Sequence, residues 1–206
     1  MTAQPSLANR QAAAAGSIAN KAQRADEMTA FLELIAAEGV RSYLEIGVQR
    51  GLTLLSVGLT LAPGARLVGV DLPGAAWGVK DGTGPAQIEA ACAQLRACGQ
   101  SVEMIWGNSR APEVVAAATE RGPYDLVFID GDHSLEGVTA DCENYGPMAR
   151  MFAFHDIDTP NKRGIAPDRL ARYGVHTLWA RIKSRYRHRE IIGSQRGMGI
   201  GVLWRA

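Results

Sequence analysis

Five short, almost entirely apolar runs alternate with helix-like stretches, and this alternation constrains the fold more than any other feature of the sequence. The apolar runs are Ser42–Val48, Arg66–Val70, Ser101–Trp106, Asp125–Ile129 and Met151–Phe154. Strands that are apolar throughout are buried on both faces, so the helices between them indicate a parallel sheet with a helical layer on each side. Right-handed crossovers then produce a doubly wound sheet whose ligands lie at the carboxyl ends of the strands.

The remaining segments complete this α/β fold. The helix-like stretches are Asp26–Glu38, Thr53–Leu61, Ala86–Cys98, Ala111–Arg121, Leu135–Met148 and His176–Arg187. A polar loop is expected over Asp158–Tyr173, where it can close over the site as a lid. Arg189–Ile192 and Gly199–Trp204 are separated by a short connection, so they are expected to be antiparallel strands. The sequence therefore predicts one Rossmann-like, doubly wound domain at residues 25–206, with a mostly parallel seven-stranded sheet that ends in an antiparallel hairpin, after a lead-in at residues 1–24.

The turn after the first expected strand has the features of a ligand-binding loop. Gly47 and Gly51 permit close approach of the backbone. The helix that begins near Thr53 directs free N–H groups and a partial positive charge toward whatever occupies the turn. Glu45, at the end of the strand, can accept a hydrogen bond from an ammonium group or order the loop.

An acid at the end of the second expected strand suggests that the ligand is a nucleoside. Asp71 lies 20 residues beyond Gly51, where a carboxylate can bind both hydroxyls of a ribose. The alternative is that Asp71 only starts the turn before Pro73. The turn from Gly47 to Gly51 has no G-x-G and no Lys-Ser/Thr pair, which disfavours a dinucleotide site, a nicotinamide-dependent reductase and a phosphate-binding P-loop.

Acids and histidines follow the fourth and fifth expected strands. Because parallel neighbouring strands end at the same edge of a sheet, we expect these side chains to converge. They are Asp130, Asp132, His133, His155 and Asp156. A divalent cation could bind there and acidify a substrate hydroxyl, or His133 could take the proton directly. The alternative is structural, with the aspartates shaping a turn and His155 a satisfied buried ring.

The ordered set of motifs resembles the class I S-adenosylmethionine-dependent methyltransferases, from about Glu27 to Trp204. The resemblance rests on Glu45-x-Gly47-x-x-x-Gly51, the acid that ends the second strand and the closing hairpin. It implies a methionyl group near the two glycines, ribose on Asp71 and adenine near Asn108 and Ser109, which could alternatively cap a helix. The cofactor-binding residues that we expect are Glu45, Gly47, Gly51, Thr53, Asp71, Asn108, Ser109 and Asp130.

One branch of that family is closer. The segments FIDGDHSLEG, ENYGPM and FAFHDI resemble small-molecule O-methyltransferases related to macrolide and sugar methyltransferases and to the cephalosporin hydroxylase group. This resemblance implies His133, Asp130 and Asp156 as catalytic residues, and Asp130, His155 and Asp156 as ligands of magnesium. His155 departs from the acidic pair of the metal-dependent relatives, which admits a softer metal or none. The Pro-Gly-Gly turn usual before the fifth strand is replaced by Pro147-Met-Ala-Arg-Met151.

We therefore expect methyl transfer from S-adenosylmethionine to a hydroxyl of a small molecule, with a general base and with or without a divalent metal. The alternatives are a metal-dependent hydrolase or hydroxylase-like enzyme on the same scaffold, and a non-catalytic S-adenosylmethionine-binding protein. Residues 161–206 hold 11 Lys and Arg against 2 Asp and Glu, which suggests an anionic acceptor or only a solvated helix face.

The sequence also bears on nucleic-acid binding, membrane insertion and the redox state of the cysteines. No nucleic-acid motif is present, and the apolar runs are too short to span a bilayer. The three cysteines, Cys92, Cys98 and Cys142, form no C-x-x-C pair, which indicates reduced thiols and no zinc ribbon. We expect a cytoplasmic protein that can form a homodimer.

Overall fold

The five apolar runs and the two strands of the closing hairpin form one seven-stranded sheet in the computed structural model, which describes residues 23–74 and 82–205. The strands are β1 (Ser42–Ile46), β2 (Arg66–Asp71), β3 (Ser101–Trp106), β4 (Tyr124–Ile129), β5 (Ala149–His155), β6 (Arg187–Ile191) and β7 (Ile200–Trp204). Their order across the sheet is β3-β2-β1-β4-β5-β7-β6. Neighbours among β1 to β5 pair in parallel, whereas β7 runs antiparallel to both β5 and β6. The predicted fold class is confirmed.

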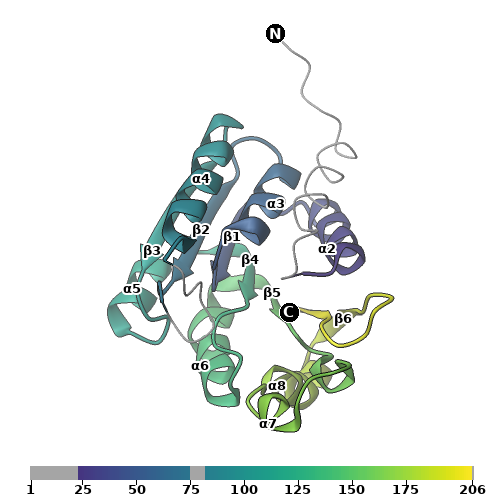
Figure 1. Cartoon of the computed structure of the whole chain (residues 1–206). Helices are drawn as coiled ribbons and strands as arrows, with labels where there is room; N and C mark the ends of the chain where they lie inside the picture. Colours follow the sequence, from purple (N-terminus) through teal and green to yellow (C-terminus); the bar gives the residue numbers. More distant parts are fainter. Residues whose placement is uncertain (1–22, 75–81, 206) are drawn as a thin grey trace.

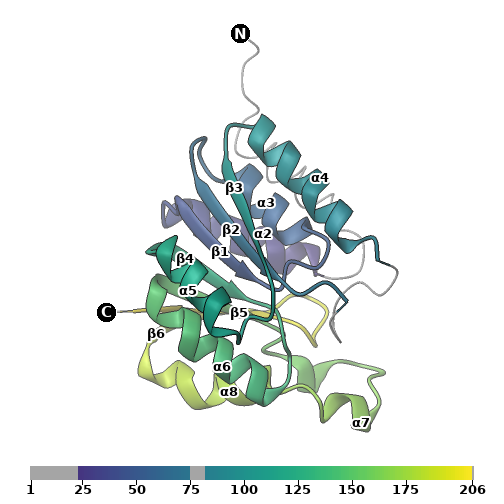
Figure 2. The ribbon, with the colours of Figure 1, turned by 90° about the vertical axis from the view of Figure 1, so that its left-hand side faces the viewer.

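Helices cover both faces of this sheet (Figure 1). One layer contains α2 (Ala25–Ala37), α3 (Leu52–Thr60) and α4 (Gly84–Ala97), and the other contains α5 (Pro112–Glu120), α6 (Leu135–Tyr145) and α8 (Val175–Ile182). Figure 2 shows the sheet between the two layers. The chain therefore places β1 and β4 side by side at the centre, where the strand order reverses and a doubly wound sheet opens its ligand crevice.

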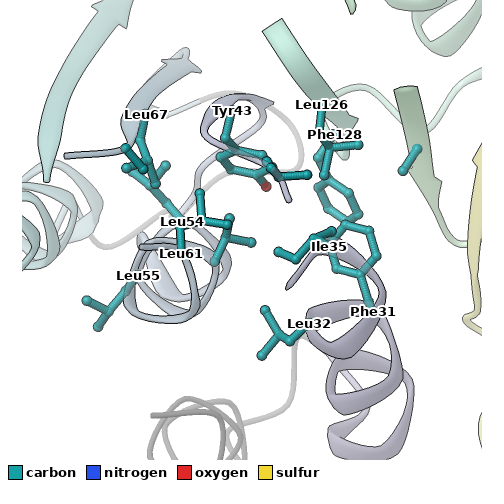
Figure 3. Packing of buried hydrophobic residues seen from close by; sticks show 14 of the residues in the cluster. Phe31, Leu32, Ile35, Tyr43, Leu54, Leu55, Leu61, Leu67, Leu126 and Phe128 are labelled. Carbon is teal, nitrogen blue, oxygen red and sulfur yellow. The ribbon is translucent and has the colours of Figure 1, made fainter. Parts of the chain in front are cut away.

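The layer of α2, α3 and α4 seals its face of the sheet with large side chains (Figure 3). The rings of Phe31 on α2 and Phe128 on β4 lie 5.3 Å apart between centroids, and both side chains are fully buried. Leu54 on α3 and Leu67 on β2 are also fully buried in this cluster. This packing fixes α2 against the centre of the sheet and so determines where the residues just before α2 must lie.

The C-terminal part differs from the prediction in detail. The expected loop over Asp158–Tyr173 contains a 3₁₀ turn (Thr159–Asn161) and α7 (Pro167–Leu170). The helix predicted over His176–Arg187 ends earlier, because α8 ends at Ile182 and a 3₁₀ turn (Lys183–Arg185) follows it. Strand β6 begins at Arg187 rather than at Arg189, and its first four residues are exposed, so they carry no apolar signal. Polar edge strands of this kind are hidden from a hydrophobic pattern.

Two further predictions concern the described residues. Cys92, Cys98 and Cys142 are all free thiols. Within residues 23–74 and 82–205, no helix combines the length and the apolar character that a bilayer crossing requires. Most of the predicted lead-in, residues 1–22, lies outside the described residues.

Candidate functional site

The turn between β1 and α3 depends on two glycines with positive φ. Gly47 has φ +89° and Gly51, the N-cap residue of α3, has φ +79°. A Cβ atom on Gly47 would lie 2.4 Å from the backbone oxygen of Asp130, so only glycine lets this turn pack against the loop after β4. The N-cap residue of α3, Gly51, has no side chain that could cap the first turn, and the free N–H groups at the start of a helix carry a partial positive charge. The structure thus brings the two predicted glycines and the start of the predicted helix to the edge of the sheet where the strand order reverses.

Asp71 holds this turn in place. Its Oδ2 accepts hydrogen bonds from the backbone N–H groups of Val48 at 2.8 Å and Gln49 at 2.7 Å. Gln49 itself has φ +56°, which is uncommon for a residue with a side chain and which these bonds help to stabilise. Sequence reasoning offered Asp71 as a ribose acceptor or a turn starter; the structure shows an acid that orders the glycine turn through one of its two oxygens.

Glu45 is a buried carboxyl beneath the same turn. Only 1% of its surface is exposed, and Oε2 accepts a hydrogen bond of 2.8 Å from the hydroxyl of Tyr43. Burial raises the pKa of Glu45 well above its ordinary value, and the nearby charges of Asp130 and Asp71 raise it further. This shift favours the protonated carboxyl, and the side chain acts as a buried support of the turn.

The residues predicted near adenine lie after β3. Asn108 is exposed, and its Oδ1 accepts from the backbone N–H of Arg110 at 3.0 Å, which shapes the turn into α5. The backbone oxygen of Ser109 accepts a 2.6 Å hydrogen bond from the hydroxyl of Tyr145 on α6. Thr53, in the first turn of α3, is buried. Asn108 thus takes part in the turn before the helix, as the structural alternative anticipated, although Ala111 is the N-cap residue of α5.

Two histidines and two aspartates form a closed, alternating arrangement at the ends of β4 and β5. His133 Nδ1 lies 2.9 Å from Asp156 Oδ2, and His133 Nε2 lies 3.6 Å from Asp130 Oδ1. His155 Nδ1 lies 3.2 Å from Asp130 Oδ1 and 3.8 Å from Asp156 Oδ1. Each imidazole therefore faces both carboxylates, and we call these four residues the His–Asp ring. Four of the five residues that we expected to converge at these strand ends therefore lie together.

The charges in the His–Asp ring stabilise one another. Burial alone would lower the pKa of His155, but the charges of Asp130 and Asp156 raise it to about 9. Burial also lowers the pKa of His133. The hydrogen bond to Asp156 and the charges of both aspartates outweigh this effect, so the pKa of His133 is raised. Burial would raise the pKa of Asp156, whereas the two histidines lower it to about 2. The charged form of each histidine and of Asp156 is therefore favoured by neighbours of opposite charge.

Backbone contacts fix the ring. Asp156 has φ +63°, and its backbone oxygen accepts a 2.6 Å hydrogen bond from the hydroxyl of the fully buried Thr159. The backbone oxygen of His133 accepts from the N–H of Gly174 at 2.7 Å. A left-handed aspartate is a strained conformation that persists only where its surroundings enforce it, and such strain often marks a functional site. Asp132 does not join the ring, because its Oδ1 accepts from the backbone N–H of Ser134 in the turn into α6.

Three residues at the site were not among the predicted catalytic, cofactor-binding or metal-binding residues. Gln23, within the predicted lead-in, is buried and donates from Nε2 to Asp130 Oδ2 at 3.1 Å. Tyr173 places its ring edge-on to His133, with 5.4 Å between ring centroids, and Lys162 Nζ lies 6.0 Å from the centre of the Tyr173 ring. Gln23 and Asp130 are 107 residues apart, and no local pattern links them. The segment predicted as a lid supplies the other two.

The loop between β6 and β7 is tied down beside the ring. The buried carboxylate of Glu27 accepts hydrogen bonds from the backbone N–H groups of Gly193 at 2.9 Å and Gly199 at 3.1 Å. Asp158 receives two charge-assisted bonds from Arg196, Nε to Oδ2 at 2.7 Å and Nη2 to Oδ1 at 2.6 Å. These contacts join α2, the lid segment and the closing hairpin into one wall.

A divalent cation fits the ring poorly. Among the described residues, no group of three or more His, Cys, Asp and Glu side chains is arranged to hold a metal ion. His155 directs Nδ1 at the two carboxylates, and its other nitrogen, Nε2, is buried without a hydrogen-bond partner in the described part of the chain. Histidines that bind metals usually have a partner for the second nitrogen, which orients the ring.

Comparison with known families decides the identity of this scaffold. A model of the methyltransferase domain matches residues 44–157, more than half of the chain, from β1 to just beyond β5. The chain belongs to this methyltransferase family. The match spans the glycine turn, Asp71 and all four members of the His–Asp ring. The resemblance to methyltransferases seen in the sequence is confirmed.

Solved structures agree with that assignment at the level of the fold. An O-methyltransferase from Bacillus cereus, in complex with SAH, is 16% identical, with a TM-score of 0.60 over 100% of this chain and 93% of that one. The O-methyltransferase TomG from Streptomyces achromogenes, involved in tomaymycin synthesis and in complex with SAM, is 16% identical, with a TM-score of 0.63 and the same coverage. The SAH-bound methyltransferase PaMTH1 of Podospora anserina is 13% identical, with a TM-score of 0.63 over 98% and 89%. A search of curated proteins found no match.

The burial of Glu45 leads to a prediction about stability. Because the raised pKa makes the native carboxyl keep its proton to a higher pH than the unfolded chain does, wild-type stability falls as the pH rises above about 4.3, the ordinary pKa of glutamate. Glu45→Gln removes this penalty, so the variant should gain stability relative to wild type as pH rises. Urea unfolding of both proteins from about pH 5 to about pH 8 measures the difference.

Glu33→Gln is the matched control, because Glu33 is exposed on α2. Its effect should stay within about 0.5 kcal/mol at every pH. A Glu45→Gln difference that is constant across this pH range would show that the native carboxyl is ionised.

Proposed function

We propose that this methyltransferase transfers a methyl group from S-adenosylmethionine to a hydroxyl of a small molecule, with His133 as general base. The observation that carries the proposal is the 2.9 Å contact between His133 Nδ1 and the buried carboxylate of Asp156. With Nδ1 donating to Asp156, Nε2 is the nitrogen that can accept a proton. A carboxylate that orients an imidazole and stabilises its protonated form is the arrangement expected of a general base.

The glycine turn and its supports fit the methyl donor. Gly47 and Gly51 present backbone without side chains, and the first turn of α3, whose N-cap residue is Gly51, can offer N–H groups to an anionic carboxylate such as that of a methionyl group. Asp71 keeps this turn in shape through Oδ2, and we assign its Oδ1 to the ribose. Asn108 and Ser109 border the adenine side. When bound, S-adenosylmethionine supplies a methyl group on a sulfonium, which is a good leaving group.

The residues of the His–Asp ring then act on the acceptor. His133 Nε2 takes the proton of the acceptor hydroxyl. The hydroxyl oxygen bonds to the methyl carbon as the carbon–sulfur bond of the donor breaks. Asp156 holds the ring and stabilises the imidazolium that forms. Asp130 sits between both histidines and keeps the cluster close to Gly47. Positioning of this kind can contribute about 7–11 kcal/mol to such a reaction, and general-base help about 10²–10⁴-fold.

The lid segment supports an anionic acceptor. Residues 161–174 carry Lys162, Arg163, Arg169 and Arg172 against the single acid Asp168. Lys162 stands over the Tyr173 ring that packs on His133, and its charge contributes to the low pKa of Asp156. A carboxylate or phosphate on the acceptor would therefore meet positive charge next to the base.

The cytoplasmic location and the homodimer stay predictions from the sequence.

Loss of Gly47 should weaken binding of the donor. Gly47→Ala adds a methyl group against the Asp130 carbonyl at a positive φ, so the turn must shift. We expect at least about a tenfold loss of affinity for S-adenosylhomocysteine, measured by calorimetry, which corresponds to about 1.4 kcal/mol. Gly39→Ala is the matched control, since Gly39 also has positive φ, +66°, but its Cβ would meet nothing within 4 Å. Equal affinity of the two variants would remove the turn from the donor site.

Loss of His133 should slow turnover without affecting the donor. His133→Ala is expected to lower kcat by about 10²–10⁴-fold on any accepted hydroxyl compound, with S-adenosylhomocysteine affinity unchanged. His188→Ala, at an exposed histidine of β6, is the control and should match wild type. Tight donor binding with no transfer by wild type to any hydroxyl compound in a broad panel would favour the non-catalytic binding protein instead.

The pH dependence of kcat tests the role of Asp156. A base must be deprotonated to act, so kcat should rise with pH through an inflection above the ordinary histidine value of about 6.5, because the pKa of His133 is raised. Asp156→Asn removes the charge that stabilises the imidazolium, so the inflection should move to lower pH and kcat should fall. An unchanged inflection in this variant would contradict the pairing.

A further inference from the structure

We propose that the site works without a divalent cation, because the His155 ring occupies, as a hydrogen-bond donor, the position between Asp130 and Asp156 that such a cation would need. The proposal deepens the proposed function by stating how the cluster is held together. Its test measures cation binding and does not depend on methyl transfer, so either proposal can fail while the other stands.

The first observation is the direction of the His155 ring. A single nitrogen, Nδ1, faces one carboxylate oxygen at 3.2 Å and a second at 3.8 Å, from Asp130 and Asp156. An oxygen of an ionised carboxylate only accepts hydrogen bonds, so the nitrogen between them must carry the hydrogen. A nitrogen that binds a metal must instead offer its lone pair. The ring therefore occupies the space between the two acids with an N–H group.

The second observation is the other side of the ring. His155 is 3% exposed, its Nε2 has no hydrogen-bond partner among residues 23–74 and 82–205, and the ring packs 6.5 Å from that of Phe128 between centroids. A ligating histidine needs a partner on this nitrogen to set its tautomer and hold the ring toward the ion. Here the contacts on Nδ1, and not a second partner, determine where the ring points.

The third observation is that the remaining carboxylate oxygens have other partners. Asp130 Oδ2 accepts from Gln23 at 3.1 Å, and Asp156 Oδ2 pairs with His133 at 2.9 Å. A cation would compete with His155 for Asp130 Oδ1. The positive charge that the two acids favour on both imidazoles would also repel it. We therefore assign His155 as a positioning residue that sets the spacing of Asp130 and Asp156.

Binding of Mn²⁺ to the full chain tests this proposal. It is measured as the loss of the paramagnetic resonance signal of free Mn²⁺. Wild-type protein is expected to bind no Mn²⁺ at the cluster. His155→Asp replaces the donor by an acid and leaves Asp130 and Asp156 in place, so this variant is expected to gain Mn²⁺ affinity by at least about tenfold. His188→Asp makes the same replacement at an exposed histidine on β6 and should show no gain.

Two results would overturn the proposal. One is a wild-type protein that binds one Mn²⁺ per chain and loses it in Asp130→Asn. The other is a His155→Asp variant that is folded by circular dichroism and binds no more Mn²⁺ than wild type, because His155 would then not be what excludes the ion. If His155→Asp does not fold, the ring ¹⁵N signals of wild type decide: Nδ1 of His155 should be protonated at neutral pH and unmoved by Mg²⁺, and a shift on adding Mg²⁺ would contradict the proposal.

Discussion

The alternation of two imidazoles with two carboxylates at the ends of β4 and β5 is the interaction on which the site depends. His133, His155, Asp130 and Asp156 all lie at least partly out of water, where each charge would be costly alone. Arranged in alternation, every positive group faces both negative ones. The cluster can therefore stay charged while largely buried, and His133 and Asp130 are its two partly exposed members.

The turn between β1 and α3 and the His–Asp ring are joined by backbone contacts. Gly47 packs directly on the backbone of Asp130, and the backbone N–H of Asp130 in turn donates to the oxygen of Ile46 at 2.8 Å, at the end of β1. Asp71 fixes the other side of the turn from the end of β2. Three adjacent strand ends thus hold one another in register, so the same backbone contacts set the places that we propose for the methyl donor and for the base.

Much of this arrangement could be predicted from the sequence, because it follows from local patterns. Apolar runs located β1 to β5, and the residues that end those runs, such as Asp71 and His155, had to lie at one edge of a parallel sheet. The partner of Gln23 could not be predicted, since it lies 107 residues away and only the packing of α2 brings the two together. Strand β6 was placed two residues late, because its first residues are charged and exposed. The bonds of Asp71 to the turn were hidden as well, since residue type does not reveal which of several donors a carboxylate accepts from.

A crystal structure of the protein with S-adenosylhomocysteine tests the central claim most directly. The account predicts the ligand in the crevice beside the glycine turn, with its ribose on Asp71 and its sulfur directed toward His133 Nε2, while the contact between His133 and Asp156 is kept. A ligand bound elsewhere, or a sulfur that faces away from the two histidines, would contradict the assignment of the cluster to methyl transfer.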